Sequence, residues 1–349
     1  MKELADILRA CRERPDKVAA LATVAQTEGS SYRRPGARML VLEGGETIGS
    51  ISGGCLEKDV VDHAASVRAA RAAILLTYDT SSEEDIVFGA GLGCKGVVRI
   101  LLEPIQPPFI GFLEHIFQSQ QAGAVATVFQ GNEVGHRLML DPDGRVSHDI
   151  ADPGLRDALM DAVQNALRNG RSTEIEHRDA AALVEIIHGP QPLVIFGGGY
   201  DAIPLVRIAK ELGCHVTVVD ARPAYADAKR FPGADAVVLA RPEQAAEKIA
   251  LTDRTAAVVM AHHYLTDSAV FASLRPRKLR YLGVMGPRKR AEKMAAENDL
   301  SLQGVHNPIG LDIGADSPEQ IALAIMAEIQ AAGAGRSGGS LREKNGPIH

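Results

Sequence analysis

The sequence predicts an α/β protein in which a Rossmann-like, doubly wound parallel sheet at the C-terminal end follows an α+β domain. After residue 190, apolar strand-like runs alternate with helical stretches, which is the pattern of a parallel sheet. A glycine turn joins the first of these runs to an amphipathic helix. The first half of the chain repeats one pattern, which indicates an internal duplication. A chain of 349 residues also exceeds the size at which one core normally stops growing, so several domains are expected.

The composition restricts the classes of function. The chain is 46% hydrophobic and 23% charged, with a formal net charge of −6, which argues against general nucleic-acid binding. No apolar run approaches the length of about 18 residues that a membrane span needs, and the charged start lacks a signal-peptide core. We therefore expect a cytoplasmic protein without a membrane or nucleic-acid partner. Disulfides would be unusual in that compartment, and no CxxC motif occurs.

The first half resembles two uneven copies of one unit, residues 1–105 and a degenerate second copy with a linker, residues 106–189. Each copy is expected to run strand, strand, turn, helix, strand. The matching segments are "LATVAQ" (21–26) with "VATVFQ" (125–130), "ARMLVLEGGE" (37–46) with "HRLMLDPDGR" (136–145), and "VVRILLEP" (97–104) with "LVEIIHGP" (183–190).

The copies differ in length. Arg38 and Val98 are 60 positions apart, whereas Arg137 and Val184 are 47 apart. The missing length falls where the first copy carries "SGGCLE" and "GAGLGCKG". Two interpretations stay open: ordinary loop variation, or a duplication in which only the first copy kept a site.

The third domain, residues 190–335, is predicted to begin at "HGPQP", because two prolines and a glycine interrupt the preceding strand. A strand then leads into a GxGxxA turn formed by Gly197, Gly199 and Ala202. Asp220 ends the next strand, roughly 20 residues further on, which is the dinucleotide fingerprint spacing. The pattern favours nucleotide binding, with phosphate at the helix N-terminus and ribose hydroxyls on the carboxylate. The alternative is a turn retained without a ligand.

The end of this domain carries a strong helix signal. Further strands are expected at "DAVVLA", "AAVVMA" and "RYLGVMG". In the last helix, Ser317 is the predicted N-cap, Pro318 occupies the first position and Gln320 completes a capping box. Residues 336–349 are polar and glycine-rich, and we expect a disordered tail.

The four cysteines have different settings. Cys94 lies in "GLGCKG", which spells GxGxxG but precedes a strand rather than a helix, so a Rossmann interpretation is rejected there. Lys95 beside it would lower the pKa of the thiol. Cys55 lies in "SISGGCLE" near the start of a predicted helix, where the helix dipole favours thiolate, and Gly53 and Gly54 leave the approach open. Two cysteines in glycine loops of one small domain favour function. Cys11 and Cys214 are expected to be inert packing residues.

Three groups of polar residues are further candidates. Arg33, Arg34 and Arg38 surround a proline turn, either as solvated surface or as an anion cradle that Lys58 and Lys95 could join. Arg288 opens a predicted helix after a strand and could meet an anion there. A metal site formed by His262, His263 and Asp267 at the carboxyl end of a strand is conceivable, although a hydrogen-bonded loop histidine is the more common outcome.

Together these segments resemble the XdhC/CoxI family. The resemblance rests on "ATVAQTEGSSYRRPGARMLV", "GSISGGCLEKDV" and "GLGCKG" at the front, and on "VIFGGGYDAIPL", "YLGVMGPRKR" and "HNPIGLDIGADSPEQIALAIMAEI" at the back. Lys95 and Ala261 depart from the family pattern, where a glycine and a threonine are common. The resemblance implies a cofactor-handling N-terminal domain and a C-terminal Rossmann domain.

The resemblance implies that the protein is a chaperone that binds molybdenum cofactor. Such a chaperone delivers the cofactor to a xanthine dehydrogenase-type molybdenum hydroxylase and assists its sulfuration by a cysteine desulfurase. The cofactor is molybdopterin or its dinucleotide form, and a homodimer is expected. Cys55 or Cys94 would contact molybdenum or carry sulfur. The expected cofactor-binding residues are Arg33, Arg34, Arg38, Gly53, Gly54, Glu57, Lys95, Gly197, Gly199, Ala202, Asp220 and Arg288.

Two other functions remain open on the sequence. An NAD(P)-dependent oxidoreductase would use the GxGxxA turn and Asp220, but no acid–base pair is evident outside the weak His262 and His263 cluster. A non-catalytic scaffold that recruits the hydroxylase and the desulfurase would bind no small molecule. We expect an accessory protein rather than an enzyme.

Overall fold

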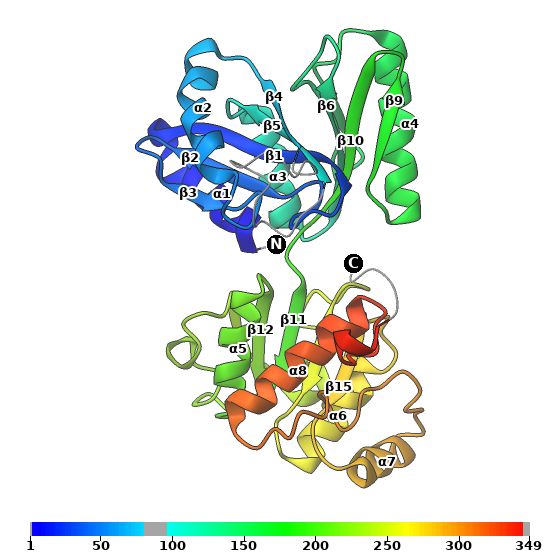
Figure 1. Cartoon of the computed structure of the whole chain (residues 1–349). Coiled ribbons are helices and arrows are strands. Elements are labelled where there is room, and N and C mark those ends of the chain that lie inside the picture. The colour runs from blue at the N-terminus through cyan, green and yellow to red at the C-terminus, as the bar shows by residue number, and fades with distance from the viewer. Residues whose placement is uncertain (1, 80–95, 345–349) are drawn as a thin grey trace. The chain divides into compact units, whose positions relative to one another are not determined.

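The computed structural model describes residues 2–79 and 96–344, which form two compact units (Figure 1). The first unit comprises residues 3–189, and the second begins at Pro190. Within the described residues, no helix is long and apolar enough to cross a lipid bilayer.

The first half of unit one, which we call copy 1, is an antiparallel sheet with a helix on it. The strands pair in the order β3-β2-β1-β5-β4, and the apolar residues of α2 pack on β1, β2 and β5. The elements are α1 (Lys2–Glu13), η1 (Pro15–Lys17), β1 (Val18–Gly29), β2 (Arg38–Leu42), β3 (Thr47–Gly49), α2 (Glu57–Ala70), β4 (Ile74–Asp79) and β5 (Gly96–Glu103).

The second half, copy 2, repeats this arrangement. Its strands pair in the equivalent order β8-β7-β6-β10-β9, and α4 covers the sheet as α2 does in copy 1. The elements are α3 (Pro107–Ser119), β6 (Ala122–Gln130), β7 (Arg137–Leu140), β8 (Val146–His148), α4 (Pro153–Asn169), β9 (Thr173–His177) and β10 (Ala180–His188). The shared strand order supports a duplication.

The strand register corrects one of the three sequence matches. Leu21 lies opposite Glu103 in copy 1, and its equivalent Val125 lies opposite Glu185 in copy 2. Glu103 therefore corresponds to Glu185, so residues 97–104 match residues 179–186 rather than 183–190. The sequence match was wrong by four positions. A shift by an even number of residues leaves every side chain on the same face of the strand, so the alternation of side chains does not reveal the error.

Buried ion pairs join the two copies reciprocally. Arg38 of copy 1 binds Glu185 of copy 2, and Arg137 of copy 2 binds Glu103 of copy 1. All four side chains are nearly inaccessible to solvent. Both guanidinium groups pack on the Phe109 ring, whose centroid is 5.5 Å from Arg38 Cζ and 4.4 Å from Arg137 Cζ. Equivalent residues thus hold the copies together from both sides.

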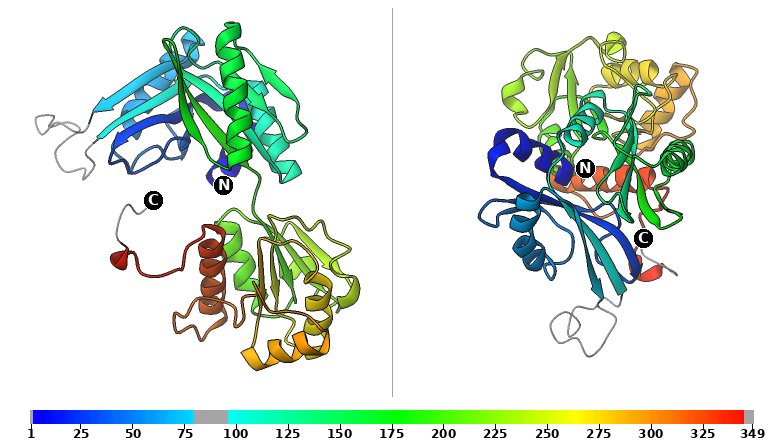
Figure 2. Two further views of the ribbon diagram at one scale, coloured as in Figure 1. Left: turned by 90° about the vertical axis from the view of Figure 1, so that its right-hand side faces the viewer. Right: turned by 90° about the horizontal axis from the view of Figure 1, so that it is seen from above.

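Unit two is a parallel sheet covered on both faces by helices, as the sequence predicts (Figure 2). The strand order is β13-β12-β11-β14-β15; α5 and α8 pack on one face, and α6 and α7 on the other. The elements are β11 (Pro192–Phe196), α5 (Ala202–Glu211), β12 (His215–Asp220), η2 (Ala228–Arg230), β13 (Ala236–Leu239), η3 (Pro242–Gln244), β14 (Ala256–Val259), α6 (Tyr264–Leu274), β15 (Tyr281–Val284), α7 (Arg288–Glu297), α8 (Pro318–Gly333) and η4 (Leu341–Glu343).

The start of α8 confirms the predicted cap. Ser317 accepts a hydrogen bond from the Gln320 backbone, and the Gln320 side chain accepts one from the Ser317 backbone. The short helix η4 lies within the segment predicted to be a disordered tail.

Candidate functional site

Two connections of copy 1, those that hold Cys55 and Cys94, are longer than their equivalents in copy 2, as is the β1–β2 connection, residues 30–37 against residues 131–136. Residues 50–56 join β3 to α2, whereas residues 149–152 join β8 to α4. The β4–β5 connection spans residues 80–95, whereas residues 178–179 make the equivalent turn in copy 2. Cys55 lies in the first long connection. Gly91, Gly93, Cys94 and Lys95 fall in the second, outside the described residues.

The loop that holds Cys55 is organised by Ser52. The Ser52 hydroxyl accepts hydrogen bonds from the backbone N–H groups of Gly54, Cys55 and Leu56, each at 3.2 Å, and donates to the Glu57 carboxylate. Glu57 also accepts from the Ser52 backbone at 2.9 Å and from the Ser50 hydroxyl at 3.0 Å. Burial raises the pKa of Glu57, but these hydrogen bonds outweigh it and lower the pKa overall.

This network engages several of the predicted site residues within the loop itself. The backbone N–H groups of Gly54, Cys55 and Leu56 donate to Ser52 within the loop rather than pointing toward a ligand. Glu57, expected among the cofactor-binding residues, has its carboxylate engaged within the loop. The half-buried Cys55 and the exposed Gly53 and Gly54 remain at the surface. A side chain at Gly54 would meet none of the described residues within 4 Å.

The three predicted arginines diverge. Arg33 forms an ion pair with Glu3, which also accepts a hydrogen bond from the Ser50 backbone at 2.7 Å and so links α1 to the loop. Arg34 is exposed. Arg38 is buried against Glu185, so the arginine cradle predicted from the sequence is reduced to its first two members.

An aromatic side chain that the sequence reasoning missed lies beside this loop. Tyr32 is 70% exposed, and its ring packs over Gly53, where a side-chain carbon would lie 3.6 Å from it. Tyr32 lies in "SSYRRPG", next to the predicted arginines, and this position is the sequence signal that could have identified it. The surface of the Cys55 loop therefore combines a thiol with an aromatic ring.

The other described cysteines suit packing roles. Burial, with a smaller contribution from Glu114, raises the pKa of Cys11 to about 11. Burial also raises the pKa of Cys214 to about 11, and the side chain packs in the core beneath α5. Both thiols are thereby kept protonated and unreactive.

In unit two, the glycine turn has the geometry that the fingerprint requires. Gly197 has φ of +123°, and a side chain there would lie 2.5 Å from the Met260 carbonyl oxygen, so only glycine fits. Asp220, at the end of β12, accepts hydrogen bonds from the backbone of Gly198 at 2.8 Å and of Arg222 at 2.9 Å. The Arg222 side chain also binds this carboxylate. Burial raises the pKa of Asp220, but these bonds outweigh it and lower the pKa.

The predicted metal residues do not converge. Asp267 is buried and binds the Ala261 backbone at 2.9 Å and Arg290 at 2.6 Å. Burial raises its pKa, against the opposing effects of these partners. His263 caps α6 through Thr266, and His262 turns to Asp201. Arg288 begins α7, at the same carboxyl edge of the sheet.

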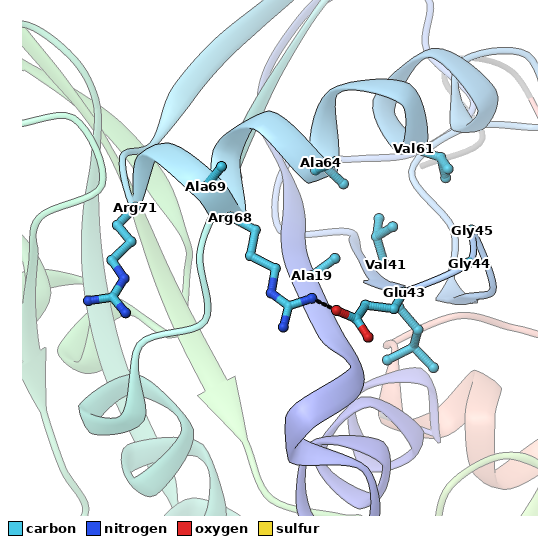
Figure 3. Close-up of a pocket in the computed structure, with 12 residues that line it drawn as sticks. Ala19, Val41, Glu43, Gly44, Gly45, Val61, Ala64, Arg68, Ala69 and Arg71 are labelled. Carbon is cyan, nitrogen blue, oxygen red and sulfur yellow. Dashed lines mark ion pairs between the residues drawn. The ribbon is translucent and has the colours of Figure 1, made fainter.

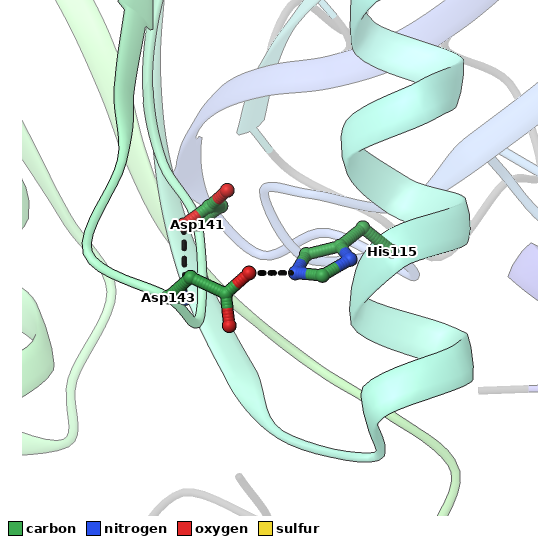
Figure 4. Close-up of side chains that lie close together, drawn as sticks. All are labelled: His115, Asp141 and Asp143. Atoms are coloured by element: carbon green, nitrogen blue, oxygen red, sulfur yellow. Dashed lines mark hydrogen bonds and ion pairs between the residues drawn. The ribbon is translucent and has the colours of Figure 1, made fainter.

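Elsewhere in the described chain, His115, Asp141 and Asp143 bring possible ligand atoms within 4.8 Å of one another (Figure 4). His115 Nε2 is 3.2 Å from Asp143. Asp141, however, accepts hydrogen bonds from the backbone of Asp143 at 2.9 Å and of Arg145 at 2.8 Å. These bonds shape the tight turn between β7 and β8, which accounts for the cluster without a metal.

A groove along α2 was also not predicted (Figure 3). Small side chains of α2, including Ala64 and Ala65, leave it open, and Arg68 crosses it to Glu43. Arg71 lies at its end. Since α2 extends over Glu57–Ala70, these arginines are about 20 Å from the Cys55 loop, and the groove is a separate feature.

Known proteins resemble this chain over most of its length. The model of the XdhC and CoxI family matches residues 13–79, and that of the XdhC Rossmann domain matches residues 193–329. A probable xanthine dehydrogenase subunit of Bacillus subtilis (strain 168) is 33% identical over 319 residues, which cover 89% of this chain and 92% of that protein. "Uncharacterized protein YqeB" of Escherichia coli (strain K12) is 28% identical over 152 residues, 41% of this chain and 28% of that protein.

A solved structure agrees with these matches. The crystal structure of a xanthine dehydrogenase from Bacillus halodurans is 26% identical in sequence and has a TM-score of 0.80. The match covers 99% of this chain and 98% of that one, so it includes both copies and the parallel sheet. By sequence and by fold, the chain belongs to the XdhC and CoxI family.

Proposed function

We propose that this protein binds molybdenum cofactor through copy 1, delivers it to a xanthine dehydrogenase-type hydroxylase and assists the sulfuration of the cofactor together with a cysteine desulfurase. Membership of the xanthine dehydrogenase accessory family supports a role in molybdoenzyme maturation. The observation that carries the finer proposal is the Cys55 loop, which copy 2 lacks.

The residues present fit such a cargo. A cysteine sulfur is a suitable soft ligand for molybdenum or a carrier of sulfur, and Cys55 is a free, half-buried cysteine at the surface of the loop. The cofactor supplies an anionic oxo-metal centre and a phosphate, and the exposed Arg34 offers a guanidinium to either. Ser52 and Glu57 would hold the thiol in place. Cys94 and Lys95 remain proposed partners in the same site.

Unit two would bind a nucleotide, either the extension of a dinucleotide cofactor or NAD(P). The glycine turn and Asp220 support this proposal. Asp220 would accept hydrogen bonds from ribose hydroxyls once Arg222 releases it. A cytoplasmic homodimer that binds the hydroxylase and the desulfurase completes the proposed function.

The proposal is tested by identifying what the protein carries. Protein purified from molybdenum-replete cells should release a pterin and molybdenum in equal amounts on denaturation. Adding the loaded protein to the apo-hydroxylase and the desulfurase should restore activity more than free cofactor does. Turnover of a bound nicotinamide would instead support the oxidoreductase alternative, and hydroxylase activation without any bound small molecule would support the scaffold.

A further inference from the structure

The parallel sheet of unit two has one point at which its strand order reverses. The chain passes from β11 to β12 and β13 on one side, then returns to β14 and β15 on the other side of β11. Ligands of open α/β sheets bind at the carboxyl ends of the strands beside such a switch point. A small cavity lies there, lined by residues that include Gly197, Asp220 and Ala261. The switch point is between β11 and β14.

A contact between a histidine and a carboxylate spans this point. Asp201 belongs to the turn after β11, and His262 belongs to the turn after β14. His262 Nε2 lies 3.1 Å from the Asp201 carboxylate. The Asp201 side chain makes no capping bond to α5, although it occupies the N-cap position, so its carboxylate is free for the histidine. The pair therefore links the two turns that flank the crevice.

His262 is held in an unusual position. Its φ of +59° is in the left-handed region, which costs a non-glycine residue free energy. The neighbouring Ala261 is fixed by buried Asp267, which Arg290 binds in turn. The imidazole lies over the glycine turn, 3.9 Å from where a side chain on Gly199 would begin. These contacts direct the ring toward the position that a phosphate takes in a dinucleotide fold.

We propose that Asp201 and His262 form a latch on a site for a nucleoside diphosphate group. With the pair closed, the Asp201 carboxylate lies by the start of α5, where a phosphate would bind, and repels it. A ligand must displace Asp201 from His262, after which the imidazole is free to contact the phosphate. The inference rests on the proposed nucleotide binding by unit two and is independent of Cys55.

The two partners of the pair should have opposite effects on binding. Asp201→Asn keeps the size of the side chain, removes the repulsion and releases His262, so we expect NADH and ADP-ribose to bind at least about fivefold more tightly. His262→Asn leaves an unpaired carboxylate and removes the phosphate contact, and asparagine tolerates the left-handed backbone, so binding should weaken. The double variant Asp201→Asn with His262→Asn should not bind these ligands more tightly than the wild type, because the tighter binding expected of Asp201→Asn acts through His262.

The experiment is titration of full-length protein with NADH, followed by fluorescence, and with ADP-ribose, followed by calorimetry. Glu292→Gln, at an exposed position on α7, is the matched control for the change in net charge and should not alter binding. Asp201→Ser serves as a second charge-removing variant, and thermal unfolding checks that each variant is folded.

Weaker or unchanged binding by folded Asp201→Asn would overturn the latch, as would a double variant that keeps the gain. Absence of binding in both the wild type and Asp201→Asn would overturn it too, because no nucleotide site would then exist for the pair to guard. Molybdenum bound to the same preparations reports separately on copy 1, so failure here is distinguishable from failure of the proposed cofactor delivery.

Discussion

Copy 1 and copy 2 share a strand order but not their connections. Each sheet is covered by one long helix, and each contributes an arginine and a glutamate to the other. The β1–β2, β3–α2 and β4–β5 connections are longer in copy 1 than their equivalents in copy 2. The duplicated parts therefore preserve the fold, and the added loops are where a site is expected, because binding residues often lie on loops that a rigid scaffold positions.

The caps of the covering helices show the same contrast in detail. In copy 2, the Asp152 side chain accepts a hydrogen bond from the Leu155 backbone at 2.8 Å and directly caps α4. In copy 1, the Ser52 hydroxyl accepts three backbone hydrogen bonds ahead of α2 and is itself held by Glu57. A simple cap suffices to start a helix. The larger network also fixes the residues around Cys55.

The largest expected effect comes from breaking the shared scaffold. Arg137→Met would leave Glu103 buried without its cation, and removing one partner of a buried pair costs about 3–5 kcal/mol of unfolding free energy. Urea unfolding measures this cost. Arg38→Met should be less costly, because that pair is slightly more exposed, at 7% and 8% against 3% and 1%.

The double variant Arg137→Met with Glu103→Leu tests whether the unpaired charge of Glu103 causes the loss of stability. It should recover most of the lost stability, because no unpaired charge then remains buried. A double variant as unstable as Arg137→Met alone would show that the ion pair does not determine the stability of this interface.

Patterns local in sequence anticipated much of this architecture. The GxGxxA turn, the Ser317 cap and the duplication were predicted because each depends on neighbouring residues or on repeated segments. The pairing of Arg38 with Glu185 could not be predicted, since these residues are 147 positions apart and either could equally face solvent. The inward direction of the loop amides was missed for a related reason: it depends on the rotamers of Ser52 and Glu57.

A smaller effect is expected when the copy 1 network alone is broken. Ser52→Ala removes the acceptor of three backbone N–H groups, and we expect a loss of about 1–2 kcal/mol in unfolding free energy. Mass spectrometry should also show faster alkylation of Cys55 by iodoacetamide. Ser147→Ala, at an exposed position in copy 2, is the control and should change neither quantity. Equal behaviour of the two variants would mean that Ser52 does not fix the loop.

The smallest effect is a pH dependence of the same loop. Because the folded protein lowers the pKa of Glu57, the stabilisation by Glu57 is present above its ordinary value of 4.5 and is lost as the pH falls through the folded value. The amide resonances of Gly54 and Cys55 should therefore titrate with a midpoint below 4.5, measured by nuclear magnetic resonance. Glu57→Gln should abolish this titration, and a midpoint above 4.5 would contradict the network.

Copy 1 is proposed to hold the cofactor through the Cys55 thiol. The most direct test measures molybdenum bound per chain after anaerobic loading with molybdenum cofactor, for the wild type, Cys55→Ser and Cys11→Ser. We predict that Cys55→Ser folds as the wild type does but retains little molybdenum, while Cys11→Ser, which changes a thiol of α1 that packs against the core, retains it fully. Full retention by Cys55→Ser would contradict the claim, and the longer loop of copy 1 would then be a structural connection without a cofactor ligand.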